Sequence, residues 1–271
     1  MKGIKGLVWL IVVVVLVISA FPWVWLLLTA FKPPELMFVT PPAFVFQPTL
    51  RNFIRVVNES DLLHYLRNSI IIAVGSTIMA VVVGATGAYS MSRFKTGGNS
   101  LLFDVITLRM LPPIVTIIPY YYLMRTVGLL NTHFSIILSH MIYALPFAIL
   151  MLKATFDETP LDLEGSALID GCSRLGVFLR VAIPIALPAI VAVTIFSFIT
   201  SWNEFLYVLI LGGLDTQTLP IMASKESLGN FLYNWDKMAA IGVICVLPVL
   251  ALVYILQRYI VSGMTLGALK G

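Results

Sequence analysis

A few residues within or beside long apolar stretches have the chemistry to handle a hydroxyl-rich solute such as a sugar. The indole ring of Trp202 can stack on the face of a sugar ring, and Asn203 and Glu204 can hydrogen-bond to hydroxyl groups. Arg109 lies inside an apolar stretch, where a charge is costly and usually faces the protein interior or water. Together with Asn68, these positions predict a path for a polar solute.

Each of these residues also has a purely structural interpretation. Arg109 can pair with Asp104, or it can extend its guanidinium to lipid headgroups. Trp202 can anchor the chain at the membrane interface, while Asn203 and Asn68 can hydrogen-bond between helices. The sequence leaves the functional and the structural interpretations open.

Several sets of residues that perform catalysis are absent from the chain. It contains no G-x-x-x-x-G-K-[ST] phosphate loop, no H-E-x-x-H and no G-x-S-x-G. Its histidines and cysteines are dispersed, without partners at metal-ligand spacing: His64, His133, His140, Cys172 and Cys245. We therefore expect no catalytic residue, no metal site and no cofactor bound by this chain. Such a protein moves a solute rather than changing it.

The most polar stretch of the chain, residues 153–180, contains a predicted helix–turn–helix loop. Pro160 suits a helix start, and Asp162 and Glu164 favour the first helical turn. Gly171 is expected to end or bend this helix, and a second helix then runs into the next apolar stretch. Such a loop can lie on the membrane surface as an amphipathic segment. Alternatively, it can dock a soluble partner and transmit motion to the two attached spans.

The composition places these segments in an all-α membrane protein. The chain has 271 residues, of which 59% are hydrophobic and only 11% are charged. A soluble domain carries roughly a quarter charged residues, so lipid must cover much of this surface. We expect a single domain, residues 1–271, with six transmembrane helices. The six predicted spans are 7–31, 69–92, 101–124, 134–152, 181–211 and 238–257.

The first apolar stretch and the charges around the spans predict the topology. Lys2 and Lys5 precede residues 7–31, as in a signal peptide, but the stretch exceeds the usual limit of about 15 apolar residues. We therefore expect a retained first span. Six spans put both termini on one side, and a weak excess of Lys and Arg in the inner segments favours the cytoplasm. The net charge of +4 comes from scattered residues and indicates no nucleic-acid partner.

The loop at residues 161–184 resembles the cytoplasmic coupling loop of binding-protein-dependent ABC importer permeases. The family pattern is E-A-A, three residues, G, nine residues and I-x-L-P. Here the matching positions are Gly165-Ser166-Ala167, then Gly171, then Val181-Ala182-Ile183-Pro184. Gly165 replaces the family glutamate, and Glu164 lies one residue earlier, about 100° around the helix. The chain looks most like the second permease of a maltose-type carbohydrate pair; further similar segments are 107–113, 128–132, 201–205 and 257–271.

The resemblance implies a type I ABC importer permease fold, with a core at about 65–257 and a cytoplasmic tail at 258–271. It implies a multi-pass permease subunit of a sugar importer in the bacterial cytoplasmic (inner) membrane, where the subunit forms half of the translocation path. The implied partners are a second permease in a heterodimer, a homodimer of ATPase subunits that binds ATP and Mg, and an extracytoplasmic sugar-binding protein. The implied ATPase contacts are Glu164, Gly165, Ser166, Ala167, Leu168, Asp170, Gly171, Lys270 and Gly271.

The competing hypothesis is a self-sufficient secondary transporter or channel for a small polar solute. That class is expected to show paired acidic residues within the membrane for ion coupling, or an inverted repeat. Neither feature is evident in the sequence. The ABC importer permease is therefore the favoured hypothesis.

Overall fold

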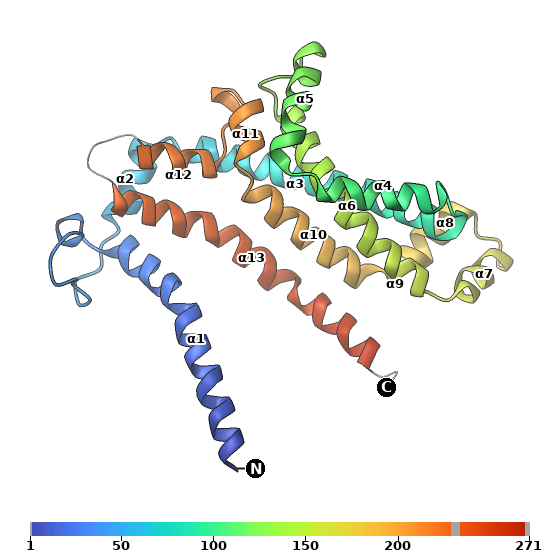
Figure 1. Cartoon of the computed structure of the whole chain (residues 1–271), viewed down its shortest axis with the longest axis horizontal. Coiled ribbons are helices and arrows are strands. Elements are labelled where there is room, and N and C mark those ends of the chain that lie inside the picture. The colour runs from blue at the N-terminus through green and yellow to red at the C-terminus, as the bar shows by residue number, and fades with distance from the viewer. Residues whose placement is uncertain (1, 229–233, 269–271) are drawn as a thin grey trace. The chain divides into compact units, whose positions relative to one another are not determined.

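The computed structural model describes residues 2–228 and 234–268, and all regular structure within these residues is helical (Figure 1). The predicted all-α architecture is therefore confirmed. Contacts along the chain group it into two compact units. The first unit comprises Met1–Tyr65 and Leu219–Pro248, and the second comprises Leu66–Thr218 and Val249–Gly271.

The first unit is a small helical assembly around the end of a long apolar helix. Side chains along α1 are almost all exposed, as expected for a helix that lipid surrounds. Its C-terminal end packs into a core with Ala30, Ala239 and Val243 buried. The helices of this unit are α1 (Lys2–Phe31), η1 (Pro34–Leu36), α2 (Arg51–Glu59), α12 (Leu219–Leu228) and the first part of α13 (Trp235–Ala268).

Polar contacts hold α2 in the first unit. The buried amide of Asn52 donates hydrogen bonds to the carbonyls of Ala30 and Lys32, so it satisfies carbonyls at the end of α1. Arg55 forms an ion pair with Asp236 at the start of α13. The segment between α1 and α3 therefore contains folded structure, η1 and α2, that packs on the end of α1.

The second unit has its core where α3, α6 and α10 meet. Phe156 and Val193 are fully buried there, together with Phe178. Small residues bring α3 close to α6, since a Cβ added to Gly84 would lie 2.7 Å from the Cβ of Ala148. Its helices are α3 (Leu62–Phe94) from Leu66 onward, α4 (Gly98–Met110), α5 (Pro113–Thr126), α6 (His133–Glu158), α7 (Leu161–Ile169), α8 (Arg174–Val177), η2 (Phe178–Ala182), α9 (Ile183–Ile185), α10 (Leu187–Trp202), α11 (Leu206–Leu211), η3 (Leu214–Thr216) and the part of α13 from Val249 onward.

Four helices are long and apolar enough to cross a membrane, and two bent helix pairs have the same character. The four are Lys5–Phe31, Leu62–Phe94, His133–Glu158 and Trp235–Gln257. The pairs are Gly98–Met110 with Pro113–Thr126, bent by 102°, and Arg174–Ile185 with Leu187–Trp202, bent by 77°. Within the described residues there are thus four candidate spans, or up to six if each bent pair is one span.

Prolines explain both bends. Pro112 precedes α5 and Pro113 is its first residue, so the helix of α4 cannot continue across them. The expectation of one continuous helix over 181–211 is wrong. Pro184 and Pro188 each lack a backbone N–H, and the chain turns between them at Ala186.

The same stretch breaks a second time near its end. α10 ends at Trp202, and α11 begins only at Leu206. Trp202 is therefore the last residue of α10, and Asn203 and Glu204 lie in the non-helical connection that follows it.

Candidate functional site

α7 and α8 form the helix–turn–helix that the sequence predicts between α6 and α10. Pro160 precedes α7, and two acidic residues lie in its first turn, where negative charge favours a helix N-terminus. α7 ends at Ile169, and Gly171 follows with a φ of +88°, which glycine adopts without steric cost. Ser173 then caps α8 by accepting a hydrogen bond from the backbone N–H of Gly176.

The helix–turn–helix exposes much of its apolar surface. Leu161 and Ile169 of α7 are 65% and 88% exposed, and Leu175 of α8 is 66% exposed. Exposed aliphatic side chains gathered on so short a segment are typical of a surface that a partner or a membrane covers.

The residues implied as ATPase contacts differ in exposure. Ser166, Leu168, Asp170 and Gly171 are exposed, and Gly165 and Ala167 are half-buried. Lys270 and Gly271 lie outside the described residues.

Glu164 is buried, unlike its neighbours on α7, and its carboxylate points into the chain. The Tyr89 hydroxyl donates a hydrogen bond of 2.7 Å to its Oε2. The Nε of Arg93 donates a hydrogen bond of 2.7 Å to its Oε1, and Nη2 of the same guanidinium donates to the carbonyl of Thr159. The partners of Glu164 in this chain are therefore on α3, away from the exposed surface of α7.

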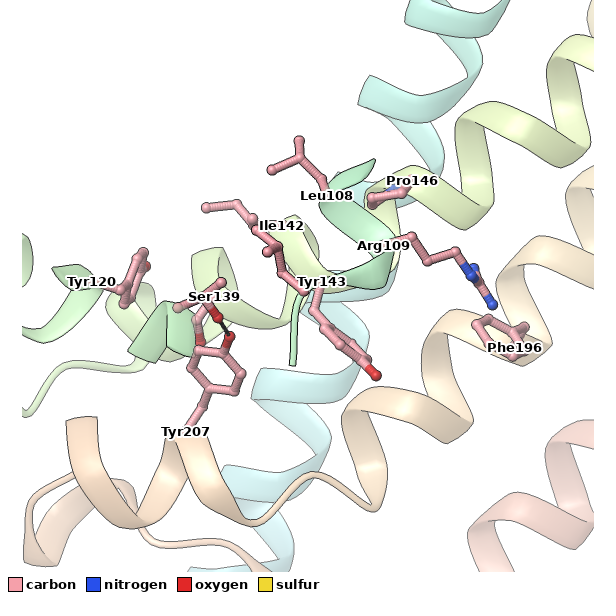
Figure 2. Close-up of a pocket in the computed structure, with 11 residues that line it drawn as sticks. Leu108, Arg109, Tyr120, Ser139, Ile142, Tyr143, Pro146, Phe196 and Tyr207 are labelled. Atoms are coloured by element: carbon pink, nitrogen blue, oxygen red, sulfur yellow. Dashed lines mark hydrogen bonds between the residues drawn. The ribbon is translucent and has the colours of Figure 1, made fainter. Parts of the chain in front are cut away.

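A pocket of about 370 Å³ lies among α4, α5, α6, α10 and α11 (Figure 2). Arg109 reaches into one end, where its guanidinium carbon lies 5.1 Å from the centre of the Phe147 ring and 5.7 Å from that of Phe196. Figure 2 shows Ser139 and Tyr207 grouped at the other end of the pocket.

No carboxylate among the described residues pairs with Arg109. The alternative of an ion pair with Asp104 is therefore not realised. The guanidinium is instead held by aromatic faces, and its hydrogen-bond donors remain free to meet a ligand in the pocket.

Glu204 caps the helix that follows it. Its Oε1 accepts hydrogen bonds of 2.9 and 3.1 Å from the backbone N–H groups of Leu206 and Tyr207. Its Oε2 lies 3.2 Å from Nε2 of His140 on α6, and Nδ1 of that histidine lies 2.7 Å from the Ser201 hydroxyl. The carboxylate is thus used within a mostly buried network that joins α6, α10 and α11.

The neighbouring residues of the Trp-Asn-Glu segment point to different environments. Trp202 is 2% exposed, and its ring stacks on Phe198 with the centroids 5.5 Å apart. Asn203 is exposed, and its side-chain amide donates to the carbonyl of Ile199. Trp202 therefore has no free face within this chain on which a sugar ring could stack.

Asn68 is buried in a polar junction between α3 and η3. Its amide donates hydrogen bonds of 2.9 and 3.0 Å to the carbonyls of Asp215 and Gln217, and its Oδ1 lies 2.8 Å from Nε2 of His133. These contacts match the alternative of hydrogen bonding between helices. Of the five residues predicted for a solute path, Arg109 lines the pocket.

The hydroxyl-bearing side of the pocket was not predicted from the sequence. Ser139 and Tyr143 both line it from α6, and their spacing of four residues on a helix is a signal that could have been used. Thr116 and Tyr207 share a hydrogen bond of 2.6 Å, although they are far apart in the sequence. No local pattern connects residues brought together in that way.

Comparison with known sequences gives matches along nearly the whole chain. The sequence model of the family described as "Binding-protein-dependent transport system inner membrane component" matches residues 77–266. The sulfoquinovosyl glycerol transport system permease protein SmoH of Agrobacterium fabrum is 33% identical, over 95% of this chain and 91% of that protein. The diacetylchitobiose uptake system permease protein DasC of Streptomyces coelicolor is 32% identical, over 100% and 99%. The trehalose/maltose transport system permease protein MalG of Thermococcus litoralis is 30% identical, over 94% and 93%.

Comparison with solved structures gives the same fold. A chain of a bacterial ABC transporter described as importing the acidic polysaccharide alginate superposes with a TM-score of 0.81, at 19% identity, over 95% of this chain and 97% of that one. A chain of the MetNI methionine ABC transporter, in an inward-facing form, superposes with a TM-score of 0.60, at 18% identity, over 74% and 95%.

Proposed function

This chain belongs to the family of binding-protein-dependent transport system inner membrane components, and we propose that it is a permease subunit of an ATP-driven sugar importer. The observation that carries the proposal is the match along at least 94% of the chain to three permeases whose names specify a carbohydrate cargo. These cargoes differ in size and charge, so the proposal covers sugars and sugar derivatives as a class.

The proposed topology has six membrane spans, with each of the two bent helix pairs counted as one. Both termini then lie in the cytoplasm, and α7 lies on the cytoplasmic side of the bacterial inner membrane. In this arrangement α2 and α12 belong to the external side.

The proposed assembly follows the family. A second permease completes the translocation path, two ATPase subunits bind ATP and Mg, and an external binding protein delivers the sugar. The absence of a phosphate loop from this sequence supports the assignment of ATP hydrolysis to a separate subunit. Lys270 and Gly271, in the tail, are further proposed ATPase contacts.

We assign docking of the ATPase to the exposed face of α7 and α8. Leu161, Leu168, Ile169 and Leu175 supply apolar surface there, and Gly165, Ser166, Ala167, Asp170 and Gly171 lie around them. An interface core of this composition is apolar with a polar rim, as in other protein–protein contacts. Gly165, which replaces the family glutamate, leaves this face without an ion pair at that position.

The pocket that contains Arg109 is proposed as part of the sugar path. Sugar sites combine aromatic faces with hydroxyl and charged hydrogen-bonding groups, and this pocket contains Tyr143, Ser139 and Arg109. Asn203 is exposed and stays a second candidate contact, whereas Asn68, Trp202 and Glu204 are proposed to shape the path by holding its helices together.

The proposal is tested by purifying the tagged chain from its native membranes in a gentle detergent and identifying the subunits that accompany it. A second permease and an ATPase are expected, and the reconstituted complex should import sugar only when ATP and the binding protein are present. Transport by the chain alone, without ATP or partners, would contradict the proposal and favour a secondary carrier.

A further inference from the structure

We propose that the buried cluster of Tyr89, Arg93 and Glu164 is an anchor that makes α7 move together with α3. This inference rests on the proposed coupling role of α7 and adds a positioning function to a residue that does not face the ATPase. In this account the ATPase moves α7 through its exposed face, and Glu164 transmits that movement to α3.

The first argument is burial. The side chains of Arg93 and Glu164 are 8% and 9% exposed, and Nη2 of Arg93 lies 2.7 Å from Oε1 of Glu164. Two charges are taken out of water only where their geometry and hydrogen bonds compensate for the lost hydration. Here both carboxylate oxygens of Glu164 accept hydrogen bonds, from Tyr89 and Arg93, so the pair is well satisfied.

The second argument is that α7 has no other buried side chain. Along Leu161–Ile169, all of which the structure describes, Glu164 is the one buried residue. A helix without a buried apolar face gains little from packing, and packing supplies most of the stability of short helices. The ion pair with Arg93 and the hydrogen bond from Tyr89 therefore attach α7 to α3, while α7 also contacts α8 and η2.

The third argument is the position of the cluster at two helix ends. Arg93 lies in the last turn of α3, and Glu164 lies in the first turn of α7. A cation near a helix C-terminus and an anion near a helix N-terminus are both favoured by the helix dipoles. The helix dipoles therefore favour an arginine at the end of α3 and a glutamate at the start of α7, and they would disfavour the two residues exchanged.

Aromatic rings pack around Tyr89, on the α3 side of the anchor. The ring of Tyr89 lies 5.4 Å from that of Phe156 on α6 and 4.8 Å from that of Phe178 on η2, measured between centroids. The guanidinium of Arg174 lies over the Phe94 ring at the end of α3. A displacement of Glu164 therefore acts on a packed junction of α3, α6 and the segment leading to α10.

Loss of the anchor should uncouple transport from ATP hydrolysis. Without it, α7 keeps its contacts with α8 and η2 and its two chain connections, at Thr159–Pro160 and at the turn containing Gly171, but it loses its attachment to α3. The exposed docking face would be unchanged, so the ATPase would still bind and hydrolyse ATP. Movement of α7 would then be absorbed by those connections instead of reaching α3.

The test compares Glu164→Gln with Glu158→Gln in the full importer reconstituted with its binding protein. Glu158 is the matched control, because it is an exposed glutamate at the end of α6, only six residues away. For Glu164→Gln we expect the ATPase to co-purify normally and sugar uptake per ATP to fall by about tenfold or more, since removing one charge of a buried pair strongly disfavours the paired arrangement. The control should retain normal co-purification of the ATPase and normal sugar uptake per ATP.

A second pair of measurements keeps the test decisive if Glu164→Gln assembles poorly. Tyr89→Phe keeps the packed ring and removes one hydrogen bond, so it should assemble and lower uptake per ATP by a few-fold. Amide hydrogen exchange over residues 161–169 should be faster in both variants than in the control. A merely structural role would reduce the amount of folded complex and leave uptake per ATP unchanged.

The outcomes separate this inference from the proposed function. If the native chain binds no ATPase, the proposed function fails. If the native complex couples uptake to ATP and Glu164→Gln couples equally well, the anchor is overturned. Loss of the ATPase from an otherwise folded Glu164→Gln protein would also overturn it, because Glu164 would then be a docking contact.

Discussion

Two charged residues of the apolar part of this chain, Glu204 and Arg109, have different surroundings. Glu204 has every oxygen occupied, by backbone N–H groups at the start of α11 and by His140. The guanidinium of Arg109 lies over the rings of Phe147 and Phe196 and pairs with no carboxylate among the described residues. Glu204 is therefore expected to support structure, because its hydrogen bonds are already made, and Arg109 is expected to serve a ligand, because no carboxylate uses its donors.

Glu204→Ala should destabilise the protein by about 1–2 kcal/mol, because α11 loses its cap and His140 loses a partner. The midpoint of thermal unfolding of the purified complex measures this effect. Asn203→Ala is the control from the next position and should shift the midpoint little. An unchanged midpoint for Glu204→Ala with uptake abolished would mean that Glu204 contacts the sugar instead.

Arg109→Gln should lower the maximal rate of uptake at saturating loaded binding protein by about tenfold, since a charge-assisted hydrogen bond to the sugar is lost. Assembly with the ATPase should be unaffected. Arg125→Gln, which changes an exposed arginine at the end of α5, is the matched control. Equal maximal rates for the two variants would remove the pocket from the sugar path.

The direction of single side chains was the least predictable feature of the site. Glu164 lies one position before the family glutamate, and this offset predicts that its side chain points away from the direction of the family glutamate. The direction itself depends on Arg93 and Tyr89, which lie more than 70 residues earlier on another helix. Local spacing carries no information about such a contact.

At the scale of elements, close approach of helices decides which glycines are required. α3 contains Gly84 and Gly87, one turn apart. A Cβ on Gly84 would lie 2.7 Å from the Cβ of Ala148, whereas a Cβ on Gly87 would meet only Ile149, at 3.9 Å. The first distance forces α3 and α6 apart, and the second is an ordinary contact.

Gly84→Ala should therefore destabilise the protein by about 1–3 kcal/mol through overpacking. Gly87→Ala adds the same methyl group to the same helix and should be neutral or slightly stabilising, because alanine favours a helix over glycine. Thermal unfolding of the two variants in one detergent makes the comparison. Similar midpoints would show that α3 and α6 are not in close contact at Gly84.

Apolar length predicted the location of the four long helices that could cross a membrane, because a membrane demands long uncharged stretches whatever their packing. The helix–turn–helix at α7 and α8 was also predicted, from Pro160 and Gly171, which act locally. The break after Trp202 was not predicted. It depends on the Glu204 carboxylate, which accepts hydrogen bonds from backbone N–H groups that a continuous helix would otherwise satisfy and which is itself in contact with His140.

At the scale of the whole molecule, the chain is one part of an importer that divides its work among subunits. It supplies spans, a pocket and an exposed helix–turn–helix that we propose docks the ATPase, and the proposed partners supply ATP hydrolysis and sugar capture. Its exposed apolar residues follow from this division. Those along α1 suit lipid, and those on α7 and α8 suit the ATPase.

The most direct test of the central claim is site-specific photo-crosslinking in native membranes. A photoreactive residue is placed at Ile169, which is 88% exposed on α7, or at Val45, which is 95% exposed in the connection before α2. We predict that the Ile169 probe captures the ATPase subunit and that the Val45 probe does not. An intact complex in which the ATPase is captured from Val45, or is never captured from Ile169, would contradict coupling through α7.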